Sequence, residues 1–384
     1  HRGIHGIIDI LKNVAVLCLD KNAKMPEFSV TSNLPSLMNG GLDFSEWSRN
    51  DKELALIMKK PVEIVLGKTG AGLVNIALAE SGFEKGTMDV YEIMTRINTG
   101  YLMAETNGKI EMCFAATGIM VKVHMSKGQL QIAENLLKSF KEKLVTEGEK
   151  LIIPNLIAIQ TWIDLHKGNT TKAKEGLKEA PDENKEFYIL DRYRYIIKVR
   201  CLISQGNLYE ALSLVERLGL YFTKYERHYL NIQNNILKAI ILFRLDSNEW
   251  KEALITALKG AEKYHFIWVI AQEGIAIKPI LSKLGKTEIS EKFFKEIKVE
   301  VDKMAVYYPE YMKEEKILKE PLTETEKTLL NLMLTSLSSN EICELCNITY
   351  STLKFHNRNI YRKLGVNSRK EAEIVANRLG LKTL

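Results

Sequence analysis

The chain has 384 residues, of which 46% are hydrophobic and 27% are charged, and its net charge at pH 7 is +6. That length accommodates two or three domains, or one domain together with a repeat array. A charge of +6 is too small to indicate nucleic-acid binding by itself. The five scattered cysteines are too few for a disulfide framework, so we expect reduced thiols in a cytoplasmic protein.

The first seventy residues carry only weak signals. The chain opens with His1 instead of Met, and charged residues interrupt its apolar start, so we expect a fragment or processed product without a signal peptide. We predict helices here and a glycine-rich turn at 39–41. The triplet 67–69 reads Gly-Lys-Thr, as in a phosphate-binding loop, but Val62 stands where such a loop requires its first glycine. An ordinary turn is therefore predicted.

No segment is suited to crossing a membrane. The longest uncharged stretch runs from Leu151 to Ile163 and is interrupted by Pro154. A helix needs roughly 20 apolar residues to span a bilayer, and this stretch is shorter.

A repeat of about forty residues organises the middle of the chain. Each copy has a turn residue, which ends one helix in the left-handed conformation, and a small alanine five positions later, which lets the next helix approach closely. The copies begin at Gly128, Gly168, Gly206 and Asn248, and their alanines are Ala133, Ala173, Ala211 and Ala253. A fixed period in this range indicates a solenoid. The sequence therefore predicts an all-α fold with a tetratricopeptide-like superhelix over residues 1–309.

A charged linker and a small head are predicted after the repeats. Residues 310–320 are charged and poor in apolar side chains, which is typical of a linker. Residues 321–384 are predicted to form four short helices, three of which open with a hydroxyl followed three positions later by glutamate. These capping boxes are Thr323 with Glu326, Ser338 with Glu341, and Ser368 with Glu371.

The third predicted helix of the head, Tyr350–Leu364, carries the strongest functional signal. It follows a short helix and a tight turn, a pattern that inserts into a DNA major groove. Six cations and no acid lie between residues 353 and 370. A solvated helix face is the usual explanation of such a run, but its position on this helix favours DNA.

The head resembles the LuxR/GerE-type helix-turn-helix family over about sixty residues. The shared residues include Leu322-Thr323, Glu326, Leu337-Ser338, Glu341-Ile342, Ile348-Thr349, Thr352-Leu353-Lys354 and Lys363-Leu364-Gly365-Val366. The chain departs from the family at Thr325, Ser336 and Asn340, where arginine, glycine and lysine are usual. Cys343 and Cys346 replace an alanine and a leucine and are small enough for the same core positions.

The resemblance implies roles for residues on the third helix. The residues expected to meet base edges are Lys354, Phe355 and Arg358. An arginine can bind guanine through two hydrogen bonds, which are worth about 1–3 kcal/mol of discrimination. Phe355 has two alternatives, contact with a thymine methyl or a partly buried surface aromatic. The residues expected to contact phosphates are Thr352, Arg362 and Lys363.

The last predicted helix, Arg369–Leu379, has an apolar stripe. Part of this stripe must close the core of the head, and the remainder suits a twofold partner. The residues in question are Ala372, Val375, Ala376 and Leu379. With the family resemblance, this stripe leads us to expect a homodimer that reads two half-sites about one helical turn apart.

The amino-acid sequence of the repeats, especially Gln205–Arg217, resembles that of the large MalT-like regulators. Those proteins join an ATPase, a helical sensor superhelix and a LuxR-type domain. The resemblance covers residues 70–384 and implies a bacterial transcription regulator. Its repeat groove would sense a small inducer or a regulatory protein, and its partners would be double-stranded DNA and RNA polymerase. ATP would belong to an upstream domain. The alternative is a helical-repeat interaction scaffold whose DNA head is secondary.

An enzyme is not indicated. The seven histidines lack metal-binding spacing, and no nucleophile elbow or glycine-rich nucleotide loop is present. Cys343 and Cys346 have zinc-like spacing, but no second pair completes a tetrahedral site. We therefore expect no catalytic, cofactor-binding or metal-binding residues in this chain.

Overall fold

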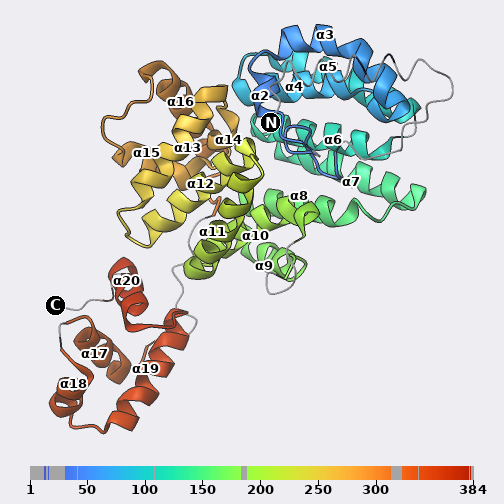
Figure 1. Cartoon of the computed structure of the whole chain (residues 1–384). Coiled ribbons are helices and arrows are strands. Elements are labelled where there is room, and N and C mark those ends of the chain that lie inside the picture. The colour runs from blue at the N-terminus through green and yellow to red at the C-terminus, as the bar shows by residue number, and fades with distance from the viewer. Residues whose placement is uncertain are drawn as a thin grey trace.

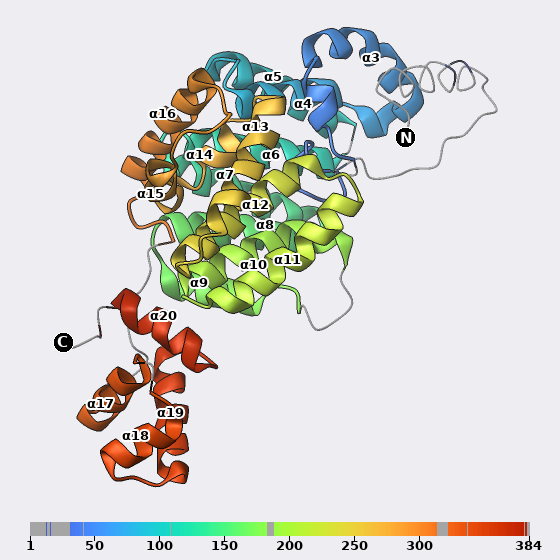
Figure 2. The same cartoon turned by 60° about the vertical axis from the view of Figure 1, so that its left-hand side comes forward.

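The computed structural model describes residues 31–40, 42–107, 109–182, 188–312, 322–335 and 337–379, together with residues 13, 16 and 381. Every regular element in these ranges is a helix, which confirms the predicted all-α fold (Figures 1 and 2). No helix within them has the length and apolar character needed to cross a membrane. Predictions for most of the first thirty residues, for Gly41 and for residues 313–320 lie outside these ranges.

Fifteen of the α-helices in these ranges belong to the repeat region. They are α2 (Ser45–Ser48), α3 (Asp51–Leu66), α4 (Leu73–Lys85), α5 (Val90–Thr106), α6 (Ile110–Met125), α7 (Leu130–Glu147), α8 (Ile153–His166), α9 (Thr170–Lys178), α10 (Arg192–Ser204), α11 (Leu208–Lys224), α12 (His228–Arg244), α13 (Trp250–Tyr264), α14 (Trp268–Ala271), α15 (Gly274–Lys283) and α16 (Glu291–Tyr307). The Gly-Lys-Thr triplet lies in a short 3-10 helix, η1 (Gly67–Gly70), between α3 and α4.

These helices form a two-layered superhelix of consecutive pairs. The first helix of each pair (α4, α6, α8, α10 and α12) is buried nearly all round, whereas the second helix (α5, α7, α9, α11 and α13) buries one stripe. Twelve of the sixteen residues of α6 are buried, but only four of the eighteen residues of α7 are. The first helices therefore make an inner layer that needs protein on every side.

The turns between paired helices have the predicted backbone, with one correction. Gly128, Gly168 and Gly206 adopt φ values of +70°, +69° and +74°. In the fourth copy the left-handed residue is Asp246, at +56°, and not Asn248 as predicted. The reason is the end of α12, because Asp246 lies two residues beyond it, as Gly168 and Gly206 do after α8 and α10.

The superhelix closes on itself. The amide nitrogen of Ile267, just before α14, donates to the Glu84 carbonyl of α4 at 2.7 Å. The rings of Phe83 and Trp268 lie 4.9 Å apart across the same junction. Figure 1 shows the first and last repeats meeting there, so the inner helices enclose a central space.

Residues after α16 enter that central space. The Tyr308 hydroxyl donates to the carbonyl of Met125 at 2.9 Å. The Tyr311 ring stacks on His166 at 3.9 Å, and its hydroxyl donates to Glu273 at 2.7 Å. Tyr311 and Met312 are each 1% exposed. The predicted linker at 310–320 thus begins too early, because Tyr311 and Met312 belong to the superhelix core despite their charged neighbours.

The head has four helices and a core of its own. They are α17 (Glu324–Met333), α18 (Ser339–Cys346), α19 (Tyr350–Leu364) and α20 (Arg369–Leu379). The bounds of α19 and α20 are the predicted ones. The buried core comprises Leu322, Leu329, Leu330, Met333, Ile342, Leu353, Ile360, Val366, Ala372 and Ala376.

A buried carboxyl in the superhelix makes stability depend on pH. Burial raises the pKa of Glu84 from 4.5 to about 7, although Lys122 lies 3.4 Å away and the Tyr229 hydroxyl donates to it at 2.7 Å. Between these two values the folded chain holds a proton on Glu84 that the unfolded chain has released. The free energy of unfolding therefore falls as pH rises through this window.

We predict that Glu84→Gln flattens this dependence. One pKa unit corresponds to about 1.4 kcal/mol, so the wild-type chain should lose about 3 kcal/mol between pH 4.5 and 7 from this group. Urea unfolding at several pH values measures the loss, and the exposed Glu142→Gln serves as the control. Equal slopes in the wild type and Glu84→Gln would contradict the assignment.

Candidate nucleic-acid interface

Reciprocal caps fix where the helices of the head begin. Thr323 Oγ1 accepts from the amide of Glu326 at 3.2 Å, and the Glu326 carboxylate accepts from the amide of Thr323 at 2.8 Å. Ser338 and Glu341 repeat the arrangement, so both predicted capping boxes are confirmed.

The third box is only half formed. Ser368 Oγ accepts from the amide of Glu371 at 3.2 Å, as predicted. The Glu371 carboxylate, however, accepts from the amide of Asn367 at 2.7 Å, one residue before the expected partner. The helix start is still capped, because two amides at this end gain acceptors.

A tight turn joins α18 to α19. Asn347 ends α18 in the left-handed conformation at φ +51°, and the amide of Ile348 returns to the Cys343 carbonyl at 3.0 Å. Thr349 then caps α19 by accepting from the amide of Thr352 at 3.2 Å. This is a helix-turn-helix in which α19 is the second helix.

The two cysteines of α18, which both precede this turn, pack against the core of the head. Cys343 and Cys346 are half-buried against the core of the head. No group of three or more potential metal ligands occurs in the described part of the chain.

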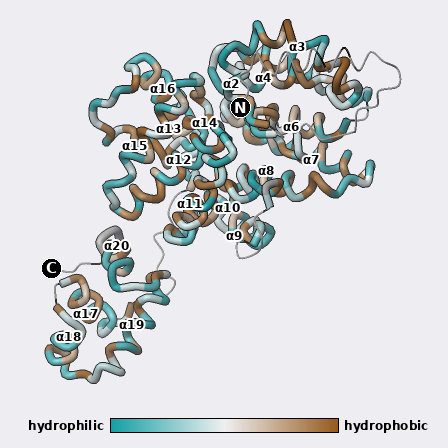
Figure 3. The backbone as a smooth tube through the Cα atoms, in the orientation of Figure 1, coloured by the Kyte–Doolittle hydropathy of each residue, from teal (hydrophilic) through white to brown (hydrophobic). Residues whose placement is uncertain are grey.

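One side of α19 is a basic face, which we define as Lys354, Phe355, Arg358 and Arg362. All four side chains are exposed, whereas Leu353 and Ile360 on the other side are buried. The spacing of four between the cations places them along one stripe. Figure 3 shows α19 as mostly hydrophilic with apolar interruptions. Phe355 is 61% exposed, so its ring is open to contact from outside.

Thr352 lies at the edge of this face. It is half-buried, and its hydroxyl lies 2.9 Å from that of Thr349. The side chain therefore belongs to the cap of α19, at the end where the helix dipole is positive and favours anions. This position is compatible with the predicted phosphate role.

The predicted role of Lys363 requires a correction. The sequence indicated a phosphate contact, but the side chain is only 10% exposed, and its ammonium lies 2.6 Å from the Glu326 carboxylate on α17. Burial opposes the ionisation of Glu326, but the bonds from Lys363 and Thr323 lower its pKa. The pair joins α17 to α19 inside the head. Sequence spacing could not show it, because the partners are 37 positions apart.

Arg369 also has a structural position that sequence reasoning missed. Its guanidinium donates to the carbonyls of Met333, Thr335 and Leu337, at 2.9, 3.0 and 2.7 Å. These carbonyls belong to the last residue of α17 and to two residues just beyond it, where helix carbonyls lack partners within the helix. Two members of the cation run, Lys363 and Arg369, therefore stabilise the head itself.

The predicted dimerisation stripe on α20 is corrected in part. Ala372 and Ala376 are 1% and 0% exposed within the core of the head, because α20 must close that core. Val375 is half-buried against the same core. The side chain of Leu379 lies outside the described residues.

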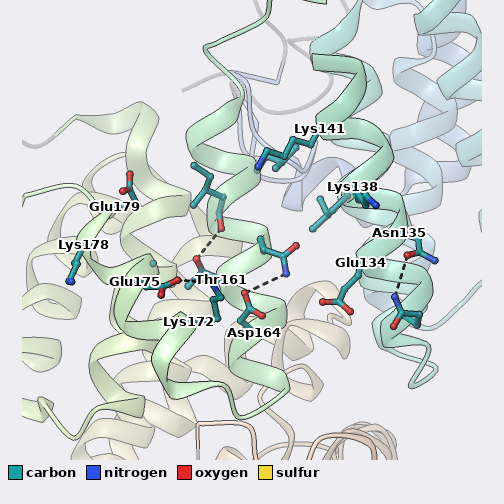
Figure 4. Close-up of a pocket in the computed structure, with 16 residues that line it drawn as sticks. Glu134, Asn135, Lys138, Lys141, Thr161, Asp164, Lys172, Glu175, Lys178 and Glu179 are labelled. Carbon is teal, nitrogen blue, oxygen red and sulfur yellow. Dashed lines mark hydrogen bonds and ion pairs between the residues drawn. The ribbon is translucent and has the colours of Figure 1, made fainter. Parts of the chain in front are cut away.

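The concave side of the superhelix, where the sequence placed an inducer groove, is filled by the chain itself. A cavity of about 30 Å³ remains near Lys122, Arg200 and Tyr229. A volume of this size is suited to a water molecule and not to a metabolite. A larger hollow of about 850 Å³ opens instead between α7, α8 and α9 (Figure 4).

Most residues that line this second hollow, the α7–α9 groove, are polar or charged, and Leu137, Leu156 and Ile157 add apolar surface. Its floor on α8 includes Thr161 and Asp164, and burial raises the pKa of Asp164. Gln160 donates to the Asp164 carboxylate at 3.4 Å. Its flanks carry both charges, from Glu134, Lys138, Lys141, Lys172, Glu175, Lys178 and Glu179 (Figure 4).

Comparison with known families agrees with this architecture. Residues 96–287, half of the chain, match the family described as the MalT-like TPR region. The chain belongs to the MalT-like TPR family. Residues 320–376 of this MalT-like chain match the bacterial regulatory proteins of the luxR family. Both family resemblances and the predicted fold class are thereby confirmed.

Several relatives are regulators named HTH-type transcriptional regulator MalT. The MalT-like chain is 25% identical to that of Vibrio parahaemolyticus over 238 residues, which cover 56% of this chain and 26% of the relative. It is 26% identical over 238 residues to that of Vibrio campbellii, with the same coverage, and 26% identical over 223 residues to that of Yersinia pestis. The MalT-like chain matches about a quarter of the length of these relatives.

We predict that Lys363→Met destabilises the head. It leaves the Glu326 carboxylate buried without its cation, and breaking a buried ion pair costs about 3 kcal/mol or more. Calorimetry of the full chain should show one transition shifted to lower temperature, whereas the exposed Lys370→Met should shift none. If Lys363→Met left the thermal transitions unchanged and lowered the affinity for all DNA sequences alike, the phosphate-contacting role of Lys363 would be restored.

Proposed function

We propose that this chain is a sequence-specific DNA-binding transcription regulator with α19 as its recognition helix. The observation that carries the proposal is the basic face, where exposed cations extend from the second helix of a helix-turn-helix. Lys354 and Arg358 have no ion-pair partner among the described residues. The luxR-family match and the names of the relatives support the same conclusion.

Lys354, Phe355 and Arg358 are proposed to read bases. The two cations are four residues apart, which is about 6 Å along the helix axis. Successive bases in one DNA strand are spaced by about 3.4 Å, so the two side chains match bases that are roughly two positions apart in the strand. Arg358 can pair with a guanine edge, and the exposed Phe355 ring can contact a thymine methyl.

Arg362 and Thr352 are proposed to contact phosphates on either side of the bases that are read. Arg362 lies one turn beyond Arg358, and Thr352 lies at the capped end of the helix. Such contacts set the register of the protein on the duplex without reading sequence.

A homodimer on DNA and contact with RNA polymerase belong to the same proposal and rest on the family resemblance. Because Ala372 and Ala376 are inside the head, a partner would have to pack on other parts of α20. A dimer would read half-sites about one helical turn apart.

The repeat region is proposed to sense a small inducer or a partner protein. The α7–α9 groove supports this second part, because its volume of about 850 Å³ is in the range of ligand sites and its floor carries Asp164 and Thr161. Its lining favours a polar ligand with hydroxyl or amino groups. A scaffold that binds a protein there without a small ligand is the alternative.

We predict different effects for Arg358→Ala and Arg362→Ala. Loss of a bidentate base contact should relax the preference at one base pair by about 1–3 kcal/mol, whereas loss of a phosphate contact should weaken all sequences alike and reduce the salt slope by about one. Selection from a random duplex library, followed by titrations at several salt concentrations, measures both effects.

Lys127→Ala is the control for this pair, since that lysine lies at the exposed turn between α6 and α7. It should change neither base preference nor salt slope. Identical behaviour of the two arginine variants would refute the division of roles, and absence of selected sequences with the wild-type chain would refute the DNA function.

For the sensing function, a screen of metabolites by thermal shift should yield a selective ligand. We predict that Asp164→Asn abolishes the stabilising effect of this ligand. The control Glu142→Gln should preserve the effect, because Glu142 lies on α7, which flanks the groove, but does not line the groove itself. A ligand whose effect survives Asp164→Asn would place sensing elsewhere. Protein capture without any thermal shift would favour the scaffold.

A further inference from the structure

The central space of the superhelix contains a segment that is not helical. Residues 31–40, which we name the plug, read Thr-Ser-Asn-Leu-Pro-Ser-Leu-Met-Asn-Gly and run through turns and bends. In Figure 1 the plug is the dark blue stretch beside α6. Its apolar side chains Leu34, Leu37 and Met38 are at most 1% exposed. The plug therefore occupies the concave side that a solenoid ordinarily offers to ligands.

A carboxylate on α4 accepts hydrogen bonds from main-chain amides of the plug. The Glu80 side chain accepts from the amides of Leu37 and Met38 at 2.7 and 2.9 Å, and from the Ser36 hydroxyl at 2.5 Å. Glu80 itself is 0% exposed, and Lys122 lies 3.6 Å from it. Two successive amides on one carboxylate make a backbone contact that does not depend on the side chains of the segment.

Donors on two other inner helices, and one donor directly before a third, bind main-chain carbonyls of the plug. Asn155 of α8 donates to the carbonyl of Asn33 at 2.9 Å. Arg192 of α10 donates to the carbonyl of Asn39 at 2.9 Å and also to that of Gly40. Arg227, which precedes α12, donates to Gly40 at 3.3 Å. Successive repeats thus supply groups for the main chain of the plug.

The backbone of the remaining inner helix, α6, lies directly against the backbone of the plug. A Cβ atom added to Gly118 would lie 2.4 Å from the Pro35 carbonyl oxygen and 2.5 Å from the Pro35 Cβ. The position therefore admits only glycine while the plug backbone is in place. With this contact, four first helices, from α4 to α10, and the residue that precedes α12 contribute to holding the plug.

The chemistry of these contacts differs from that of an ordinary core. The Glu80 carboxyl group and the Arg192 guanidinium are almost completely buried, and, apart from the bond of the Ser36 hydroxyl, the bonds named above go to main-chain amides and carbonyls. Burying charges is costly unless their hydrogen bonds are met. A packing role needs only apolar side chains, whereas a row of polar groups directed at a backbone is suited to holding a peptide in one defined, turned conformation.

We propose that the inner face of the superhelix is a peptide-binding groove, and that residues 31–40 occupy it in cis. The partner it fits is an uncharged segment that adopts the same turned backbone and has a proline, then a hydroxyl residue, then two apolar residues, like Pro35-Ser36-Leu37-Met38. A second polypeptide with this pattern competes with the plug for Glu80 and Arg192. The proposal is independent of the DNA function.

The test keeps the full chain. A protease site is inserted before Leu42, which is 68% exposed, so that cleavage frees the plug from the superhelix without removing it. The N-terminal fragment should remain bound during gel filtration and exchange with an excess of labelled peptide 31–40. Circular dichroism establishes that the cleaved complex keeps its helices.

Three comparisons make the test specific. A peptide N-methylated at Leu37 and Met38 should bind at least tenfold more weakly, because it lacks the two amides that Glu80 accepts. A scrambled peptide should not exchange. Glu80→Gln in the full chain should speed exchange, whereas Glu142→Gln should not.

Two results would overturn the proposal. The fragment could fail to exchange, with helix content lost when urea removes it, and residues 31–40 would then be core and the groove would not exist. Alternatively, the N-methylated or scrambled peptide could bind as well as the native one, and the contacts with Glu80 would then confer no recognition.

Discussion

The architecture depends on one constraint, the need of the first helices of the repeats for protein on every side. An α-helix with one apolar stripe can rest on a neighbour and face water with the remainder. The helix α6 cannot, because twelve of its sixteen residues are buried. Pairing with second helices covers only its outer side. The inner side must be covered by something else, and here the superhelix closes, with α14 meeting α4 and the chain itself filling the centre.

Part of the filling of the centre is a network of polar side chains, which gives it a defined geometry. Arg200 and Glu273 form a fully buried ion pair, and Tyr311 donates to the same carboxylate. Burial lowers the pKa of His166 to about 3, so its ring stays neutral while it stacks on Tyr311. A buried charge without its partner is much less stable than the satisfied pair. The network therefore favours one packing of the last residues before the linker.

The head uses its cations for two different purposes. Lys363 and Arg369 face inward, where they hold α17 against α19 and meet the carbonyls at the end of α17. Lys354, Arg358 and Arg362 face outward on the basic face. A domain of four short helices has little apolar core, so leaving the buried Glu326 carboxylate without Lys363 would remove a large part of its stability. A stable head is what keeps the outward cations in fixed positions.

The sequence by itself determined whatever depends on short spacings. The capping pairs at Thr323 and Ser338, the bounds of α19 and the left-handed turn at Gly206 follow from residues within a few positions of one another. Only the tertiary structure decided which side chains face inward. The partners Lys363 and Glu326 are far apart in sequence, the alanines of α20 look alike whether they face a core or a dimer, and Tyr311 and Met312 lie among charged neighbours. Burial depends on contacts between residues that are far apart in sequence, and local periodicity does not determine which of these contacts form.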